Sequence, residues 1–367
     1  MPSPFRYDSA NRLLPLGKQE PLTLQYTSAN KRGLNLVALG GGTGLSTLLA
    51  GLKCLVNDDQ ADEGSIANLS AIVTVSDDGG SSGRLRDELQ MLPPGDIRNC
   101  MIALSEDSNL LSRLFRYRFR GDGELGGHSF GNLFLAALTE VTGDFTEAVK
   151  LSSEILASKG HIFPATISDV RLVAELSDGT VVRGETQISS SRVPIRRLRL
   201  EPEQCLPLPE VLRAIRGADV ITVGPGSLYT SILPNLLVAR VSQAIGESPA
   251  TKIFICNLMT QPGETDNYDA RQHLQTIKTY APEIHFDFVV VNNRRITSQQ
   301  SERYALEGAH QIGMDDDSID SILDQSTQII RTPLLEEGEK VRHDSMLLSR
   351  VVLACRQQAC SQPAVPA

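Results

Sequence analysis

Apolar, β-branched runs alternate with stretches of helical periodicity along most of the chain. Continuous apolarity of this kind suits strands that are buried on both faces, and it occurs in LNLVAL (34–39), SAIVTV (70–75), DVITV (219–223), KIFICNL (252–258) and FDFVVVN (286–292). Helix-like segments follow most of these runs, and Pro234 is expected to divide one of them. The alternation predicts an α/β fold with a mostly parallel sheet and helices on both faces.

Residues 161–202 break this pattern. VRLVAEL and VVRGETQI alternate apolar with polar positions on either side of Ser177-Asp178-Gly179-Thr180, which is a strong hairpin signal. We therefore expect a small antiparallel β insertion within the α/β domain, at about 161–202.

The composition of the 367 residues is that of a globular protein, with 41% hydrophobic and 22% charged residues, which excludes wholesale disorder. One α/β domain is expected to span 33–357. The flanking segments, 1–32 and 358–367, are polar, contain proline and lack periodicity, so both are predicted to be disordered tails.

The charge and the cysteines limit the partners and the compartment. Lys+Arg 35 against Asp+Glu 44 gives a formal net charge of -9, which repels phosphate at long range and argues against a protein that coats nucleic acid. No apolar run approaches the roughly 20 residues that span a bilayer, and the N-terminus lacks the apolar core of a signal peptide. The six cysteines are scattered, without a C-x-x-C pair. We expect a cytoplasmic protein with reduced thiols and no transmembrane segment, and leave a homo-oligomer open.

The first candidate site is the glycine loop after the first strand. Gly40-Gly41-Gly42-Thr43-Gly44 stands between a buried strand and a helix, where bare backbone lets a phosphate approach closely and Thr43 can donate a hydroxyl. It is not the dinucleotide fingerprint, because position 45 is leucine, and no Gly-Lys-Ser/Thr of a P-loop follows. A tight strand-to-helix turn is the alternative.

The second candidate follows the next strand, in Ser76-Asp77-Asp78-Gly79-Gly80-Ser81-Ser82-Gly83-Arg84. Two adjacent carboxylates at a strand end can hold a ribose diol, a sugar hydroxyl or a metal-bound phosphate. Ser81, Ser82 and Arg84 supply donors for an anion beside them. The alternative is a solvated turn, since Asp and Gly favour turns.

Two further loops precede helices. In Pro93-Pro94-Gly95-Asp96-Ile97-Arg98-Asn99, Asp96 is placed to cap the following helix, and Asn99 then points toward the ligand crevice. Gly127-His128-Ser129-Phe130-Gly131 matches G-x-S-x-G, but no buried strand precedes it, so a serine hydrolase is disfavoured. His128 is the best acid/base candidate in the chain.

The C-terminal half repeats the anion pattern after its first strand. Gly226 and Ser227 stand at a helix start, and Tyr268 follows the loop 259–266, where its ring could stack on a base. Surface packing is the alternative for this tyrosine. Arg113, Arg116 and Arg120 share one face at helical spacing and are interpreted as a solvated face.

Taken in order, these motifs resemble one family closely. NLVALGGGTGLSTLLAGLK, VSDDGGSSGRLRDEL, PPGDIRNC, GHSFGNLFLAAL, GPGSLYTSILPNLLV, NLMTQPGETD and His343-Asp344 resemble the bacterial gluconeogenesis factor family, from the superfamily of 2-phospho-L-lactate transferase. The resemblance covers about 34–345. It implies a Rossmann-like fold, a cytoplasmic protein, binding of a UDP-sugar such as UDP-N-acetylglucosamine, and a role in cell shape and growth on gluconeogenic carbon sources.

Carried over residue by residue, the resemblance implies nucleotide-sugar contacts at Gly41, Gly42, Thr43, Gly44, Asp77, Asp78, Ser81, Ser82, Arg84, Asn99, His128, Asn132, Gly226, Ser227, Tyr229 and Tyr268. The family usually places a lysine shortly after His343-Asp344, and this chain does not. The family implies no assigned reaction. No cofactor is assigned, and magnesium is the one candidate. A magnesium-dependent transferase of phospho-groups, with Asp77 and Asp78 on the metal and His128 as base, is the alternative function.

Overall fold

The computed structural model describes residues 33–56, 65–106, 109–312 and 326–361, together with the backbone of two short paired strands, β1 (Phe5–Tyr7) and β2 (Leu13–Pro15). Nearly all of the predicted N-terminal tail therefore lies outside the described residues, as do residues 362–367. The last helix, α13 (Ser345–Ser361), runs past the predicted end of the domain at 357.

Seven parallel strands form the main sheet, in the order β12-β11-β10-β9-β3-β4-β5. Their bounds are β3 (Leu34–Gly40), β4 (Ile66–Val73), β5 (His161–Pro164), β9 (Val220–Val223), β10 (Thr251–Ile255), β11 (Phe288–Asn292) and β12 (Gln328–Thr332). The central strands are apolar and almost fully buried, as continuous apolar runs require. The predicted Rossmann-like α/β fold is confirmed.

The order of the strands reverses between β3 and β9. Along the chain, the sheet first grows from β3 to β4 and β5, and then restarts at β9 on the other side of β3. In open α/β sheets, the crevice outside the carboxyl ends of the strands at such a reversal is the usual ligand site. The fold therefore predicts a ligand site at the loops after β3 and β9.

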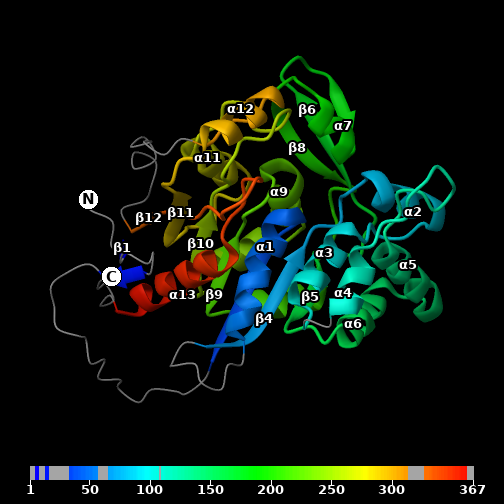
Figure 1. Ribbon diagram of the computed structural model, residues 1–367, viewed down its shortest axis with the longest axis horizontal. Helices are drawn as coiled ribbons and strands as arrows, with labels where there is room; N and C mark the ends of the chain where they lie inside the picture. Colours follow the sequence, from blue (N-terminus) through cyan, green and yellow to red (C-terminus); the bar gives the residue numbers. More distant parts are fainter. Residues whose placement is uncertain are drawn as a thin grey trace.

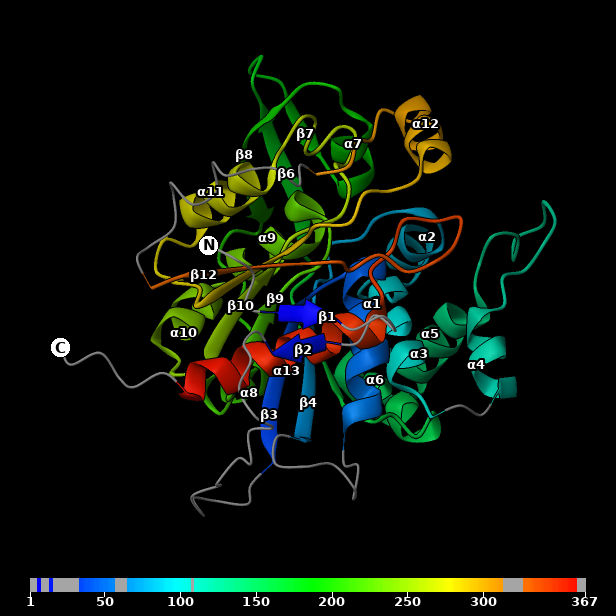
Figure 2. The ribbon, with the colours of Figure 1, turned by 60° about the vertical axis from the view of Figure 1, so that its left-hand side comes forward.

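Helices cover both faces of the sheet (Figure 1). On one face, α1 (Gly42–Leu52) packs against α3 (Gly95–Leu104) and α13, as Figure 2 shows for α1 and α13. α8 (Pro209–Arg216) and α10 (Val241–Glu247) pack against each other on the opposite face. The remaining helices are η1 (Lys53–Leu55), α2 (Gly80–Leu89), α4 (Asn109–Arg116), α5 (Phe130–Thr142), α6 (Phe145–Ile155), η2 (Leu228–Ile232), α9 (Leu233–Leu237), α11 (Ala270–Tyr280) and α12 (Ser298–Leu306).

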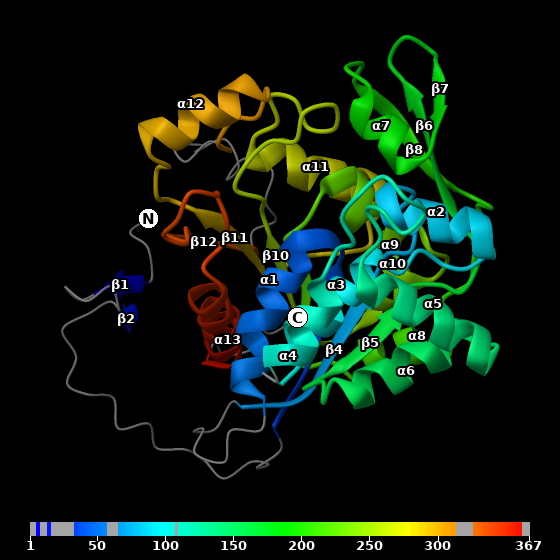
Figure 3. The same cartoon turned by 45° about the vertical axis from the view of Figure 1, so that its right-hand side comes forward.

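The antiparallel insertion is present and stands at the carboxyl edge of the main sheet (Figure 3). It comprises β6 (Arg171–Leu176), β7 (Val181–Arg183), α7 (Glu185–Ser190) and β8 (Ile195–Glu201), with strand order β7-β6-β8. Two details of the prediction are wrong. β5, at the start of 161–202, belongs to the main sheet, and VVRGETQI is a strand only to Arg183, because Gly184 adopts φ of 90° and α7 begins after it.

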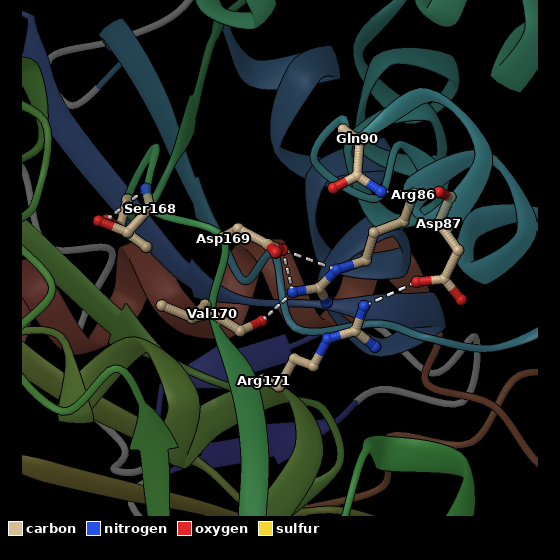
Figure 4. A network of polar contacts seen from close by, with 8 residues as sticks. Arg86, Asp87, Gln90, Ser168, Asp169, Val170 and Arg171 are labelled. Atoms are coloured by element: carbon tan, nitrogen blue, oxygen red, sulfur yellow. Dashed lines mark hydrogen bonds and ion pairs between the residues drawn. The ribbon is translucent and has the colours of Figure 1, made fainter.

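A buried arginine ties the insertion to α2 (Figure 4). The side chain of Arg86 is 1% exposed; its Nε donates to Oδ1 of Asp169 at 2.9 Å, and its Nη2 donates to the carbonyl of Val170. Beside it, Nη2 of Arg171 donates to Oδ1 of Asp87 at 2.7 Å on the surface. Because α2 begins in the acidic loop after β4, this contact fixes the insertion relative to that loop.

Candidate functional site

The glycine loops after β3 and β9 meet where the strand order reverses. An added Cβ at Gly44 would stand 2.4 Å from the carbonyl oxygen of Pro225, so only glycine permits this close approach. The amide of Leu45 donates to the carbonyl of Gly41 and is the first to bond within α1. The three preceding amides have no intrahelical acceptor, and with the helix dipole they favour an anion.

An open cleft of about 380 Å³ lies over these loops. It brings together six of the residues that the sequence singled out, namely Gly41, Gly42, Thr43, Gly44, Gly226 and Ser227. Residues outside the predicted set of contacts also line the cleft, including Asn257, Gln261, Tyr304, Lys340, Arg342 and His343. Only the His343-Asp344 pair, through the family resemblance, pointed to the wall formed by 340–343.

The peptide group of Gly226 is already paired with a side chain. Its N–H donates to Oδ1 of Asn257 at 3.0 Å, and Nδ2 of Asn257 donates back to its carbonyl at 2.7 Å. The hydroxyl of Ser227 accepts a hydrogen bond from Nε2 of Gln261. Since that hydroxyl keeps its own hydrogen, it can still donate to a ligand, whereas Gly226 offers a close approach but not its N–H.

Asp96 does not cap its own helix, which corrects the prediction. α3 begins at Gly95 without any side-chain cap. The Asp96 carboxylate instead lines the cleft and accepts a hydrogen bond from the amide of Gly42, and an added Cβ at Gly41 would be 2.7 Å from its Oδ2. Burial, and then the charge of Asp77, raise the pKa of Asp96 to about 6. A carboxyl group in the cleft thus titrates near neutrality.

Glu185 brings a second carboxyl group into the cleft, from the insertion. Burial raises its pKa to about 9, with further contributions from the charges of Asp77 and Asp96. Glu185 is therefore protonated at pH 7 and can donate as well as accept a hydrogen bond. The sequence missed this residue because it lies in a segment that was predicted to be a strand.

The two carboxylates of the acidic loop have separate surroundings. Oδ1 of Asp77 accepts from the amide of Gly79 at 2.8 Å. Oδ1 of Asp78 accepts from both the amide and the hydroxyl of Thr186, at 2.8 and 2.7 Å. An added Cβ at Gly184 would stand 2.0 Å from Oδ2 of Asp78. Asp78 therefore holds the start of α7, and through it positions Glu185.

Ser81, His128 and Asn132 form a buried hydrogen-bonded cluster between α2 and α5. Nη1 of Arg98 donates to Oδ1 of Asn132 at 2.8 Å, which turns Nδ2 of Asn132 toward Oγ of Ser81, at 3.0 Å. Oγ of Ser81 also forms a hydrogen bond with Nδ1 of His128, at 3.0 Å. Burial, and then the charge of Arg84, lower its pKa.

Ser129 caps α5 and is not a nucleophile. Its Oγ accepts from the amide of Asn132 at 3.2 Å and from Nη1 of Arg98. Within the described residues no strand leads into it, and the residues before it form turns and one isolated bridge. The strand that a nucleophile elbow requires before its serine is therefore not formed before Ser129.

Three other predicted contacts lie around this cluster. Ser82 packs against Gly95, where an added Cβ would be 2.4 Å from the serine Oγ. Nη2 of Arg84 donates to the carbonyl of Gly126 at 2.6 Å. Asn99 accepts from Nη2 of Arg98 at 2.8 Å and lines a second cleft beside the first.

Tyr229 and Tyr268 contact each other through hydroxyl groups 3.0 Å apart. Tyr229 is 3% exposed, and burial raises its pKa. Neither ring lines the cleft over the glycine loops. The stacking of a base on Tyr268 stays a prediction.

The described residues contain no group of three or more His, Cys, Asp or Glu side chains arranged to hold a metal ion. Asp96 and Asp77 lie close enough for the charge of Asp77 to raise the pKa of Asp96, and Mg²⁺ bound with phosphates needs only one or two carboxylates. All six cysteines lie within the described residues, and none of them forms a disulfide. Among the described helices, none is long and apolar enough to cross a membrane.

A cleft at the reversal of the strand order, beside the start of α1, is the arrangement that ligand-binding α/β proteins share. Comparison with known proteins identifies the family to which the chain belongs. Residues 36–335 match the family described as 2-phospho-L-lactate transferase CofD, and the chain belongs to that family.

Similar proteins extend the match along nearly the whole chain. The gluconeogenesis factor of Halalkalibacterium halodurans is 44% identical over 327 residues, which cover 89% of this chain and 98% of that protein. The gluconeogenesis factor of Bacillus subtilis is 44% identical over 311 residues, covering 84% and 94%. The crystal structure of protein BH3568 from Bacillus halodurans superposes with a TM-score of 0.81 at 44% identity, covering 88% of this chain and 100% of that chain.

Proposed function

We propose that the protein is a cytoplasmic UDP-sugar-binding regulator, required for growth and cell shape on gluconeogenic carbon sources. The observation that carries the proposal is the cleft at the reversal of the strand order, where the start of α1, with the amides of Thr43 and Gly44, shares one surface with Lys340 and Arg342. Proteins hold a diphosphate with the backbone amides of a helix start and with lysine and arginine side chains. The relatives named gluconeogenesis factor support the physiological role.

The carboxyl groups of the cleft suit the sugar part of such a ligand. Asp96 and Glu185 lie on the side of the cleft nearest the acidic loop and the insertion. A protonated Glu185 can donate to a carbonyl or hydroxyl oxygen, and Asp96 can accept from a hydroxyl group. A ligand with a diphosphate at one end and a polyhydroxylated ring at the other fits a cleft that has Lys340 and Arg342 for the diphosphate and Asp96 and Glu185 for the ring.

A thermal-shift titration tests the proposal. UDP-N-acetylglucosamine at about 100 times its dissociation constant should stabilise the fold by roughly 2.7 kcal/mol. Arg342→Ala should weaken this binding, whereas Arg113→Ala, an exposed arginine on α4 outside the cleft, should not. Parallel titrations with guanosine and nicotinamide nucleotides define the base preference. The absence of a shift with every uridine nucleotide sugar would refute the proposal.

A metal-dependent transfer of a phospho-group is the second candidate, and the family description favours it. Asp77 and Asp96 are the two carboxylates whose charges act on each other beside the glycine loops. A bound Mg²⁺ would neutralise the charge of a transferring phosphate there. Turnover of a nucleotide donor that is lost in Asp96→Asn would support this candidate. Tight binding without product over long incubation would count against it.

A further inference from the structure

A second cleft of about 380 Å³ lies on the other side of the α1 start from the glycine-loop cleft. Its walls come from α1, α3, the end of α4 and the segment that leads into α13. The residues are Thr43, Ser46, Thr47, Ala50, Asn99, Ile102, Ala103, Arg116, Glu336, Arg342, His343 and Ser345. Thr43, Thr47, Arg342 and His343 belong to both clefts, so these four residues form the ridge between them.

The charges of the second cleft favour an anion. Arg116 and Arg342 both line it, both side chains are exposed, and within the described residues neither forms an ion pair. Glu336 is the one acidic residue in the lining. Two arginines against one glutamate leave a positive surface in a chain of net charge -9. Exposed guanidinium groups of this kind bind phosphate or carboxylate in the paired geometry of their N–H groups.

His343 supplies an unused acceptor on the ridge. Its side chain is 7% exposed, and its ring hydrogen-bonds to the backbone of Cys256. Nε2 has no hydrogen-bond partner among the described residues, so Nδ1 makes the bond to Cys256 and carries the hydrogen. Burial lowers the pKa of His343 to about 4, which keeps the ring neutral at pH 7. A neutral imidazole in this tautomer accepts from a hydroxyl group but cannot donate to an anion.

Asn99 adds a donor on the opposite wall. Its Oδ1 is engaged by Nη2 of Arg98 at 2.8 Å, which leaves the Nδ2 group for a ligand. The hydroxyls of Ser46 and Thr47, in contrast, already donate to the carbonyl of Thr43, at 3.1 and 2.8 Å. The second cleft therefore offers two cations and one amide donor, beside the neutral ring of His343.

We propose that the second cleft binds a small hydroxylated anion of the sugar-phosphate class, with its phosphate on Arg116 and Arg342 and a hydroxyl group on Nδ2 of Asn99. This ligand would lie across the ridge from the diphosphate of the proposed UDP-sugar. The proposal does not depend on the first cleft holding a nucleotide, because its site has its own cation, Arg116, and its own donor, Asn99.

The test uses glucose 6-phosphate as the probe on the full chain without nucleotide, by isothermal titration. We expect saturable binding to the wild-type protein, weaker binding of inorganic phosphate, and no binding of glucose. Arg116→Ala should weaken the binding of glucose 6-phosphate at least about tenfold, which is the size of a lost charge-assisted hydrogen bond. Arg113→Ala removes an exposed arginine from the same helix and should leave the affinity unchanged.

The outcomes separate this proposal from the function of the first cleft. Arg116→Ala should retain the wild-type thermal shift with UDP-N-acetylglucosamine, because Arg116 lines only the second cleft. Failure of glucose 6-phosphate to bind the wild type would overturn the proposal, as would equal losses in Arg113→Ala and Arg116→Ala. Undiminished binding in Arg116→Ala would place the sugar phosphate elsewhere and overturn it too. The results with glucose 6-phosphate do not bear on whether the UDP-sugar binds.

Discussion

The predicted contact residues form two groups on either side of Asp96. The groups differ in whether their polar atoms are already hydrogen-bonded within the protein. In the glycine-loop cleft, the hydroxyl of Thr43 is exposed and the amides at the start of α1 have no intrahelical acceptor. In the second group, Ser81, His128 and Asn132 are each at least 95% buried and bonded to one another. The first group therefore leaves polar atoms available to a ligand, whereas the polar atoms of the second group are bonded within the protein.

This contrast teaches that a cluster of Ser, His and Asn in a loop does not by itself predict ligand contact. A buried polar group must be satisfied, and in the second group the partner is another protein side chain. The first group is only partly covered by side chains: the Gly42 amide donates to Asp96 and the Gly226 peptide group pairs with Asn257, whereas the hydroxyl of Thr43 is exposed. Substitutions that separate stability from ligand affinity test the contrast.

The largest effect is expected where the two glycine loops touch. Gly44→Ala places a Cβ 2.4 Å from the backbone of Pro225, which neither loop can avoid without moving. Overpacking against backbone should lower the free energy of unfolding by roughly 3 kcal/mol, measured by urea denaturation. Gly123→Ala is the matched control, because nothing lies within 4 Å of its added Cβ. Similar stability of the two variants would show that the loops are not in contact.

The next largest effect is expected at the centre of the buried network. Arg98→Ala removes the donor to Asn132, Ser129 and Asn99 together and leaves their oxygens without this partner. We expect a loss of about 2–3 kcal/mol, since unsatisfied buried polar groups cost on the order of 1–3 kcal/mol each. Arg113→Ala should stay within about 0.5 kcal/mol of the wild type in the same urea titration. A small effect of Arg98→Ala would mean that the network does not stabilise the fold.

The pH dependence of stability tests the carboxyl group between the two regions. Because the native pKa of Asp96, about 6, lies above the ordinary 3.8, the folded protein retains a proton that the unfolded chain releases. Stability from this group is therefore complete below pH 4 and is lost as the pH rises through 6. The loss should be on the order of 3 kcal/mol. Asp96→Asn should flatten the fall in unfolding free energy between pH 4 and 6, and an unchanged slope would contradict the assignment.

The sequence predicted the centre of the fold better than its edges. β3, β9 and β10 were visible because strands buried on both faces are continuously apolar. β5 and β12 were not, because HIFP and QIIRT are short edge strands that mix polar with apolar residues. A pattern of local periodicity carries little information about a strand of four or five residues at the edge of a sheet.

The candidate site, too, could be predicted only where the local sequence was informative. The loops after β3 and β9 could be predicted, because glycine between a buried strand and a helix is typical of a turn where backbone approaches a ligand or another loop closely. Asp96 was interpreted as a cap, since an aspartate at a helix start has that role when only local sequence is considered. Its true partner, the amide of Gly42, comes from a distant strand end. Glu185 could not be found at all, because its place in the cleft depends on Asp78 holding α7.

The smallest effect on stability, and the sharpest test of the contrast, is expected from two hydroxyl groups. Thr43→Ala removes an exposed hydroxyl from the first cleft, so unfolding should stay within about 0.5 kcal/mol of the wild type. Its affinity for UDP-N-acetylglucosamine should fall roughly tenfold, because a hydrogen bond to a phosphate contributes about 1.5–3 kcal/mol. Ser81→Ala is the matched variant in the buried network, where the loss leaves Nδ2 of Asn132 and Nδ1 of His128 without their partner. Ser81→Ala should therefore lower stability by about 1–2 kcal/mol and leave affinity nearly unchanged. If Ser81→Ala weakens the ligand while stability holds, the network is part of the ligand surface, and the contrast between the two regions is wrong.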